Sequence, residues 1–276
     1  AVIFGEPSEV QLAQTENLRL LQLTWAGADK YTRMENLPQS VVLANASGAF
    51  GTIIAEYAIG SLVALYRSFG RYWSNKQAHI WQKYDHAETI SGKTALVLGM
   101  GDIGANVARR LKVFGAAVLG VKRTAVSAVP ADFDEAHTLD ALDALLPQAD
   151  IVIGCLPNTR ETAGLLTAER LHAMKTGAVL VNVGRGSLAG TDDLVSALQD
   201  GHLGGAALDV FETEPLPADC PLWDMENVLL TPHIAGPSFG GSADVQNTIW
   251  HICMDNLERY LTGNPLKNVV NRSEGY

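Results

Sequence analysis

Residues 94–104 of the chain are Thr94-Ala95-Leu96-Val97-Leu98-Gly99-Met100-Gly101-Asp102-Ile103-Gly104, and this segment has the clearest fold signal in the sequence. Its first five residues are an apolar run that predicts a buried strand, and the apolar periodicity that follows predicts a helix over Ile103–Phe114. Between strand and helix the glycines have the spacing G-x-G-x-x-G, which is typical of a turn that binds the pyrophosphate of a dinucleotide. Glycines also make ordinary turns, so the flanking strand and helix carry the prediction.

Each glycine of this turn has a separate physical purpose. Gly99 makes the tight turn, Gly101 lets the backbone approach a pyrophosphate, and Gly104 lets the helix pack closely on the strand. The free N–H groups and the positive dipole end of the helix then hold the phosphate charge. We therefore predict cofactor contacts from these three glycines and from Asp102 and Ile103.

Apolar runs and helical stretches alternate on both sides of the turn. The predicted strands are Leu18–Leu23, Val41–Ala44, Thr94–Leu98, Ala117–Val121, Ile151–Gly154, Ala178–Val183, Gly205–Val210 and Val228–Leu230. The predicted helices are Ile53–Ser68, Ile103–Phe114, Asp140–Leu146, Ala168–Met174, Asp192–Gln199 and Gly241–Leu261. We expect Thr191 to cap the helix that begins at Asp192 and Gly201 to end it. The alternation predicts an α/β fold with a doubly wound parallel sheet of Rossmann type.

Length and composition limit the classes of protein. A chain of 276 residues corresponds to about two domains. Charged residues are 18% of the chain, and 30 acidic against 20 basic residues give a net charge of −10. Because this charge repels phosphate backbones and anionic lipids, we expect neither a nucleic-acid partner nor a membrane partner. The longest apolar stretch, Thr52–Tyr66, is too short to span a bilayer and contains Glu56.

The three cysteines, Cys155, Cys220 and Cys253, are widely spaced and odd in number. They show neither a disulfide framework nor a metal-ligand spacing, so we expect no metal site and a reducing, cytoplasmic location.

The end of the strand after the glycine turn bears on the choice of cofactor. An acidic residue at that place binds the ribose 2′-hydroxyl of NAD. Here Lys122, Arg123 and Thr124 follow the strand instead. Two cations and a hydroxyl suit a 2′-phosphate, which predicts NADP (NADPH) over NAD, although such a sequence is also common at a solvated strand end.

Three later segments stand at strand ends, where a doubly wound sheet binds its ligands. They contain Arg185, Glu214 and His233. Arginine grips a carboxylate through two hydrogen bonds, histidine donates a proton near neutral pH, and a nearby carboxylate keeps the histidine charged. Each residue alone also fits an ordinary role, as a surface cation, a turn acid before proline or a loop histidine. Together they predict a site that reduces a keto acid.

These motifs resemble the NAD(P)-dependent D-2-hydroxyacid dehydrogenase family, which includes glyoxylate/hydroxypyruvate reductases. The resemblance covers about residues 18–271 and rests on the glycine turn, Asn182–Gly186, Asp209–Pro215 and Thr231–Gly236 in the family's order. It implies that Arg185 binds the carboxylate and carbonyl of a small 2-keto acid. It further implies that His233 protonates the carbonyl oxygen, as hydride arrives from NADPH, and that Glu214 orients and charges His233. The product would be a D-2-hydroxy acid.

The resemblance also implies contacts beyond the catalytic set. Ala26, Gly27 and Ala28 would receive the substrate carboxylate on their backbone N–H groups. The remaining cofactor contacts would come from Cys155, Leu156, Pro157, Val183, Gly184, Asp209, His233, Ala235 and Gly236. Cys155 need not react, because small apolar residues also suit its place.

The family has two domains and acts as a homodimer, which the resemblance implies here as well. Residues 1–70 and 244–276 would form the substrate-binding domain, a smaller flavodoxin-like α/β domain built from both chain ends. Residues 71–243 would form the dinucleotide-binding domain. Family members begin with one more strand and helix, and this chain begins at Ala1 rather than Met, so we expect an N-terminal strand and helix to be missing.

The segment Arg71–Lys93 interrupts the alternation and carries Tyr72, Trp73, Trp81 and Tyr84 in a polar setting. It is interpreted either as a connector that reaches a partner subunit or as a loop with local aromatic packing.

Two other functions remain open from the sequence. The family contains corepressors that keep the same Arg, Glu and His and sense the cofactor, and it contains phosphoglycerate dehydrogenases. No long disordered tail or basic patch supports the first, and the short chain end after the last helix weighs against the serine-regulated form of the second. The pairing of His233 with Glu214 also weighs against formate dehydrogenase, in which the family pairs the histidine with a glutamine.

Overall fold

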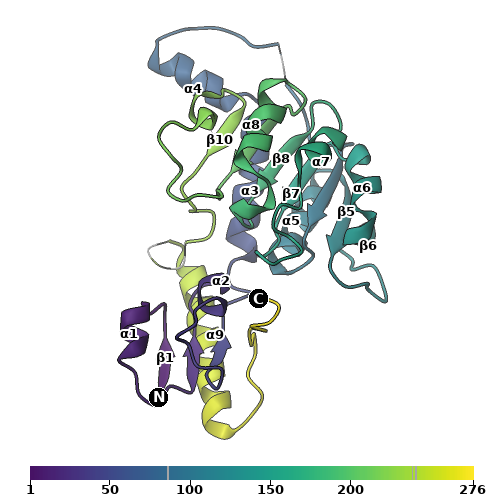
Figure 1. Ribbon diagram of the computed structural model, residues 1–276. Helices are drawn as coiled ribbons and strands as arrows, with labels where there is room; N and C mark the ends of the chain where they lie inside the picture. Colours follow the sequence, from purple (N-terminus) through teal and green to yellow (C-terminus); the bar gives the residue numbers. More distant parts are fainter. Residues whose placement is uncertain (86, 238, 240) are drawn as a thin grey trace. The chain divides into compact units, whose positions relative to one another are not determined.

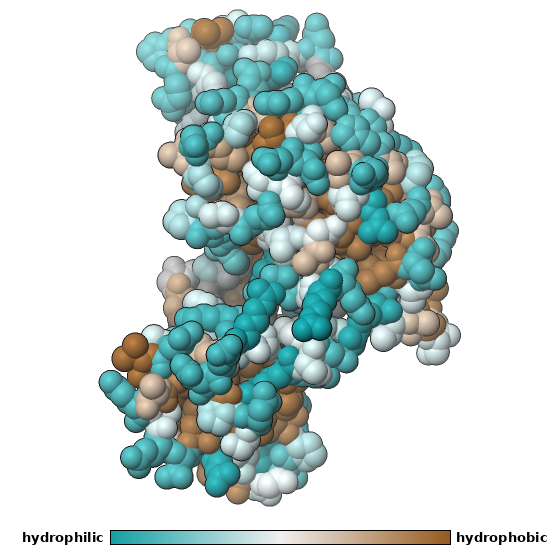
Figure 2. All heavy atoms as spheres, viewed as in Figure 1, coloured by the Kyte–Doolittle hydropathy of each residue, from teal (hydrophilic) through white to brown (hydrophobic). Residues whose placement is uncertain are grey.

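The computed structural model describes residues 1–85, 87–237, 239 and 241–276, and these form two compact units. The smaller unit comprises Ala1–Phe50, Pro157–Thr159 and Gly236–Tyr276, and the larger unit comprises Gly51–Leu156 and Arg160–Ala235. Figure 2 shows hydrophilic side chains over most of the viewed surface of each unit, with smaller hydrophobic patches between them.

The larger unit contains a sheet of seven strands in the order β10-β9-β8-β7-β4-β5-β6, and every neighbouring pair is parallel (Figure 1). The strands are β4 (Thr94–Leu98), β5 (Ala117–Lys122), β6 (Glu135–Thr138), β7 (Ile151–Gly154), β8 (Val179–Asn182), β9 (Gly205–Leu208) and β10 (Val228–Leu230). The order reverses at β4, whose neighbours are β5 and β7. Such a switch point opens a crevice beyond the carboxyl ends of the strands, which is where this fold binds its ligands.

The larger unit also contains α-helices. They are α3 (Gly51–Tyr66), α4 (Phe69–Gln77), α5 (Asp102–Val113), α6 (Leu142–Leu145), α7 (Ala168–Ala173) and α8 (Thr191–Gln199). Helix α3 packs against α5 and against β8, β9 and β10, while α7 packs against α8 (Figure 1). The strands β7, β8 and β9 are buried along their whole length, as expected for a parallel sheet covered on both faces.

The smaller unit contains a parallel sheet in the order β1-β2-β3. Its elements are β1 (Val2–Phe4), α1 (Glu9–Ala13), β2 (Leu20–Gln22), α2 (Asp29–Thr32), β3 (Val42–Ala44) and α9 (Ala243–Thr262). The fully buried Asn256 of α9 donates hydrogen bonds to Oε1 of Gln22 (2.7 Å) and to the carbonyl of Lys267 (2.9 Å). This buried amide therefore ties the last helix to a strand of the N-terminal part of the chain.

The predicted fold class is confirmed, and β4, β7 and β10 have the predicted limits. Five elements were not predicted from the sequence, namely β1, β6, α1, α2 and α4. Strand β6 is the polar run Glu-Ala-His-Thr at the edge of the sheet, so no apolar run marks it. Helices α1 and α2 have five and four residues, which is too short for a visible periodicity.

The prediction that Thr191 caps α8 is wrong. The helix begins at Thr191 itself, and its N-cap is Gly190, which has no side chain to cap it. The Thr191 N–H instead donates to Oε2 of Glu212 at 2.6 Å, so a carboxylate from another loop supplies the acceptor. Gly201, with φ +78°, follows the last helical residues and ends the helix as predicted.

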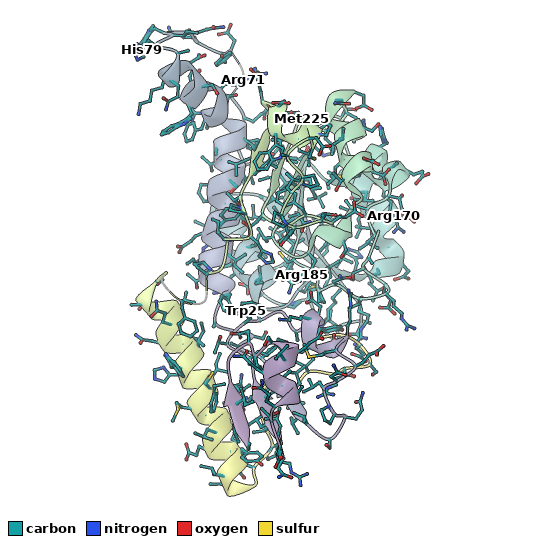
Figure 3. All side chains as sticks on the ribbon, turned by 60° about the vertical axis from the view of Figure 1, so that its left-hand side comes forward. Trp25, Arg71, His79, Arg170, Arg185 and Met225 are labelled. Atoms are coloured by element: carbon teal, nitrogen blue, oxygen red, sulfur yellow. The ribbon has the colours of Figure 1, made fainter. Side chains whose placement is uncertain are left out.

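The unit boundary differs from the expected boundary at residue 70. Helix α3 belongs to the larger unit, because its contacts are with α5 and the seven-stranded sheet. The segment Arg71–Lys93, which follows α3, contains most of α4. Figure 3 labels Arg71 and His79 in this segment. Tyr72 and Tyr84 pack edge to face with ring centroids 5.3 Å apart, whereas the side chain of Trp81 is fully exposed.

Candidate active site

The glycine turn joins β4 to α5. Gly99 has φ +108°, a conformation that favours glycine, and a Cβ there would lie 2.9 Å from the carbonyl oxygen of Cys155. A Cβ on Gly104 would overlap the carbonyl oxygen of Gly99. Both glycines are therefore required by the protein's own packing.

Gly101 differs, because nothing within 4 Å would meet a Cβ at that position. It is the N-cap of α5 and no side chain caps the helix. The turn thus leaves open space at the positive end of a helix of twelve residues, which fits a pyrophosphate. Asp102 and Ile103 begin the helix, and the Asp102 carboxylate accepts a hydrogen bond from Nδ2 of Asn106 at 3.1 Å.

The residues at the end of β5 also fit the predicted cofactor. Lys122 is the last residue of the strand and is half-buried, and Arg123 and Thr124 follow it on the surface. Because β5 neighbours β4, the cations stand at the same sheet edge as the glycine turn. No carboxylate occupies the place of the expected acid.

Cys155 follows β7, and its N–H donates to the carbonyl of Leu98 at 2.8 Å. Desolvation by burial raises the pKa of its thiol to about 12. The thiol therefore stays protonated at neutral pH. Leu156 follows it in the larger unit, and Pro157 belongs to the smaller unit.

Arg185 stands in a turn after β8 (Figure 3). The buried Asn182 side chain holds this turn, since its Nδ2 donates to the carbonyl of Arg185 (2.9 Å) and its Oδ1 accepts from the Gly184 N–H (3.1 Å). The Arg185 guanidinium donates to the carbonyl of Gly184 at 2.7 Å. Val183 and Gly184 lie in the same turn, and a Cβ on Gly184 would lie 2.7 Å from the carbonyl oxygen of Leu156.

Asp209 is a buried carboxylate directly after β9, with 2% of its surface exposed. Oδ1 accepts hydrogen bonds from the Thr231 hydroxyl (2.6 Å) and the Ile234 N–H (2.8 Å), and Oδ2 accepts from the Ala235 N–H (2.9 Å). All three partners are donors, which is what a buried carboxylate requires. Asp209 therefore ties down the loop after β10.

His233 stands in that loop with φ +55°, a left-handed conformation that costs a non-glycine residue about 1–2 kcal/mol. Its N–H donates to the carbonyl of Asp209 at 2.9 Å. Its ring Nδ1 lies 2.9 Å from Oε2 of Glu214, and Oε1 of Glu214 accepts from the Phe211 N–H at 3.0 Å. The carboxylate accepts, so Nδ1 carries a proton and Nε2 is the nitrogen left to exchange a proton with a substrate.

Arg185, Asp209 and His233 follow β8, β9 and β10, which are adjacent parallel strands. The structure therefore brings these residues and Glu214 to one edge of the sheet, the edge that also carries the glycine turn. Tyr57 of α3 was not predicted as a site residue, yet its hydroxyl lies 2.6 Å from Oγ1 of Thr231. Residues 57 and 231 are far apart in the chain, so no spacing pattern reveals this contact.

The predicted substrate loop lies in the smaller unit. The Ala26 carbonyl accepts from Nδ2 of Asn45 at 2.7 Å. The Glu6 carboxylate accepts from the N–H groups of Thr24 (2.7 Å) and Trp25 (3.1 Å). Gly27 and Ala28 complete the loop before α2. Glu6 and Asn45 thus fix this loop from two sides, and sequence reasoning assigned neither of them that role.

The predicted site residues divide between the units. Ala26, Gly27, Ala28, Pro157 and Gly236 belong to the smaller unit, and the others belong to the larger one. Within the described part of the chain, no group of three or more His, Cys, Asp and Glu side chains is arranged to hold a metal ion. The described residues also contain no helix that meets the length and hydropathy needed to cross a membrane.

Comparisons with known proteins agree with this geometry. Residues 59–235 match the family described as D-isomer specific 2-hydroxyacid dehydrogenase, NAD binding domain. The chain is 35% identical over 231 residues to glyoxylate/hydroxypyruvate reductase A of Citrobacter koseri, a match covering 82% of this chain and 70% of that protein. It is 32% identical to D-3-phosphoglycerate dehydrogenase of Mycobacterium leprae, of which it spans about half, 49%.

Solved structures are similar over nearly the whole chain. A D-isomer specific 2-hydroxyacid dehydrogenase from Xanthobacter autotrophicus Py2, in complex with NADPH and MES, is 32% identical with a TM-score of 0.87. An NADPH-dependent glyoxylate/hydroxypyruvate reductase from Sinorhizobium meliloti, in complex with NADP and sulfate, is 29% identical with a TM-score of 0.86. Each similarity covers 100% of this chain and 85% of the other. The chain therefore belongs to the D-isomer specific 2-hydroxyacid dehydrogenase family, a family of oxidoreductases with an NAD(P)-binding domain.

Proposed function

We propose that this protein reduces a small 2-keto acid to a D-2-hydroxy acid with NADPH. The observation that carries the proposal is the His233–Glu214 hydrogen bond at the sheet edge that also presents Arg185 and the glycine turn. Glyoxylate, hydroxypyruvate and short aliphatic keto acids are the substrates we expect. The similarity to reductases of glyoxylate and hydroxypyruvate supports this class.

The chain's own side chains divide the reaction between them. Arg185 binds the substrate carboxylate and polarises the neighbouring carbonyl, because its planar fork matches a carboxylate and its charge stabilises a developing alkoxide. His233 delivers a proton from Nε2 to the carbonyl oxygen, while Glu214 keeps the ring in the orientation that exposes Nε2. NADPH, when bound, supplies the hydride. The overall change is keto acid plus NADPH plus one proton to hydroxy acid plus NADP⁺.

The preference for NADPH rests on the end of β5. Lys122 and Arg123 provide the positive charge that a 2′-phosphate needs, and no acid is present to bind the 2′-hydroxyl of NADH. The NADPH and NADP in the two similar structures support the same choice. The backbone N–H groups of residues 26–28 would complete the grip on the substrate carboxylate. We also expect the protein to act as a homodimer in the cytoplasm.

A panel of 2-keto acids tests the proposal directly. We expect turnover of glyoxylate or hydroxypyruvate, a D product from substrates that yield a chiral centre, and a kcat/KM at least about tenfold higher with NADPH than with NADH. Replacing both Lys122 and Arg123 by alanine removes most of that preference. The matched control, Lys93→Ala, changes a cation at the end of β4 opposite to the glycine turn and leaves the preference intact.

A clear preference for NADH would overturn the choice of cofactor. Tight cofactor binding without turnover of any 2-keto acid would favour a cofactor-sensing protein instead.

A further inference from the structure

A chain of partly buried hydroxyl groups leads from α3 to the loop that holds His233. The Tyr57 hydroxyl lies 2.6 Å from Oγ1 of Thr231, and Oγ1 of Thr231 lies 2.6 Å from Oδ1 of Asp209. These residues all belong to the larger unit.

The direction of the hydrogen bonds follows from the number of protons. A carboxylate only accepts, so the one hydroxyl proton of Thr231 points to Asp209. The Thr231 oxygen then has only lone pairs to offer, and the Tyr57 hydroxyl must donate to it. Desolvation by burial is the main cause of a raised pKa for Tyr57, so its phenol keeps the proton that this arrangement needs. The chain therefore runs from Tyr57 through Thr231 to Asp209.

This chain of hydrogen bonds ends at Asp209, which holds the loop that carries His233, the proposed proton donor. Asp209 accepts from the N–H groups of Ile234 and Ala235, and its own carbonyl accepts from the N–H of His233. A shift of the Asp209 carboxylate thus moves the backbone directly after His233. Proton transfer depends steeply on the position of the donor, so a small displacement of His233 slows the reaction.

We propose that Tyr57 is a positioning residue for the reaction, acting through Thr231 and Asp209 to fix the backbone that carries His233. This inference deepens the proposed function and rests on it for its kinetic consequence. The Tyr57 hydroxyl hydrogen-bonds to Thr231 and reaches Asp209 only through it. Its effect therefore falls on the alignment of His233 rather than on the affinity for the cofactor. Removing its hydroxyl frees the Thr231 hydroxyl to rotate away from Asp209.

The kinetic test compares Tyr57→Phe with changes at Thr231. We expect Tyr57→Phe to lower kcat with glyoxylate and NADPH by about three- to tenfold, the range that one hydrogen bond supplies, and to leave KM for NADPH within about twofold. Thr231→Val, which removes the hydroxyl at similar size, loses at least as much, and Thr231→Ser, which keeps the hydroxyl, restores most of kcat. The double variant Y57F/T231V loses no more than T231V alone, because the two hydroxyls act in series. Losses that multiply, or a Y57F kcat within about twofold of wild type, would overturn the proposal.

A second measurement needs neither substrate nor cofactor. In the protein without ligand, hydrogen exchange of the Ile234 and Ala235 amides should be at least about threefold faster in Y57F than in wild type. The matched control is Tyr66→Phe, the same substitution further along α3, which leaves these two amides at wild-type rates. Exchange at wild-type rates in Y57F overturns the proposal whatever the kinetics show. If the wild-type protein reduces no 2-keto acid, the proposed function fails while this measurement still decides the role of Tyr57.

Discussion

The imidazole of His233 and the carboxylate of Glu214 are joined by a hydrogen bond of 2.9 Å between Nδ1 and Oε2. The other oxygen of the same carboxylate is fixed by the Phe211 N–H. One side chain therefore holds the ring of His233 and is itself held by the backbone after β9. This arrangement leaves Nε2 as the proton-donating atom and leads to a first prediction.

Replacing His233 by glutamine should remove turnover and spare cofactor binding. Glutamine has similar length but cannot donate a proton as an acid, so kcat should fall by about 10²- to 10⁴-fold. The Kd for NADPH, measured by fluorescence titration, should stay within about twofold because the turn at Gly101 is untouched. Glu214→Gln, which keeps an acceptor without the charge, should cost less than His233→Gln. Full activity of the His233 variant would refute the assignment.

Arg185→Ala should weaken substrate binding and slow the reaction together. The guanidinium grips the substrate in the ground state and stabilises the developing charge more strongly, so kcat/KM should fall by about 10²- to 10³-fold with both parameters affected. Arg185→Lys should recover only part of the loss, because an ammonium lacks the planar fork. The control is Arg109→Ala, which breaks an exposed ion pair with Asp132. An Arg185→Ala variant with wild-type kcat/KM would contradict the role.

Two glycines of the turn should respond differently to the same substitution. Gly101→Ala places its methyl group in open space with φ −82°, so the fold should keep its Tm within about 2 °C while the Kd for NADPH rises at least about tenfold. Gly104→Ala drives the methyl group into the Gly99 carbonyl, so it should destabilise the protein by about 1–3 kcal/mol or more. Thermal melting and cofactor titration of both variants separate the effects. Equal loss of stability in the two would refute the distinction.

The pair His172 and Asp200 should make stability depend on pH. Nδ1 of His172 faces the Ala168 carbonyl (2.8 Å) and Nε2 faces Oδ2 of Asp200 (2.9 Å), and both partners only accept. The hydrogen bond to Asp200, followed by that to Ala168, raises the pKa of His172, while the hydrogen bond from His172 is the main cause of a lowered pKa for Asp200. The stabilisation of the folded state by His172 is therefore complete below its ordinary pKa of about 6.5, and it is lost as pH rises through the pKa of His172 in the folded protein. The stabilisation by Asp200 is complete above pH values of about 3.9, and it is lost as pH falls through the pKa of Asp200 in the folded protein.

Thermal melting between about pH 5 and pH 9 checks this prediction. His172→Gln should lower Tm most near pH 5 and hardly at all near pH 9. His251→Gln, on α9 of the smaller unit, is the control, because Nδ1 of its ring faces the carbonyl of Asn247 (2.7 Å) within its own helix. A Tm difference for His172→Gln that stays constant over this range would refute the role of the pair.

Much of the larger unit could be predicted because its strands are continuous apolar runs. Strand β7 is buried at all four residues, so burial and sequence agree at its limits. Strand β6 could not be found, because an edge strand with polar residues lacks that signal. Arg185, Glu214 and His233 could be selected because each stands near the end of a recognisable strand. Tyr57, Asn182 and Glu6 could not, because their partners are set by packing rather than by spacing.

The glycine turn and the parallel α/β architecture follow from local residue order and apolar periodicity, and both can be predicted from the sequence. The place of α3 in the larger unit, the contact of Glu214 with Nδ1 of His233 and the contact of Tyr57 with Thr231 appear only in the folded protein. The two groups differ in the range of the interactions. Turns and strands form from neighbouring residues, whereas a hydrogen bond between residues 57 and 231 exists only after the sheet has brought distant segments together.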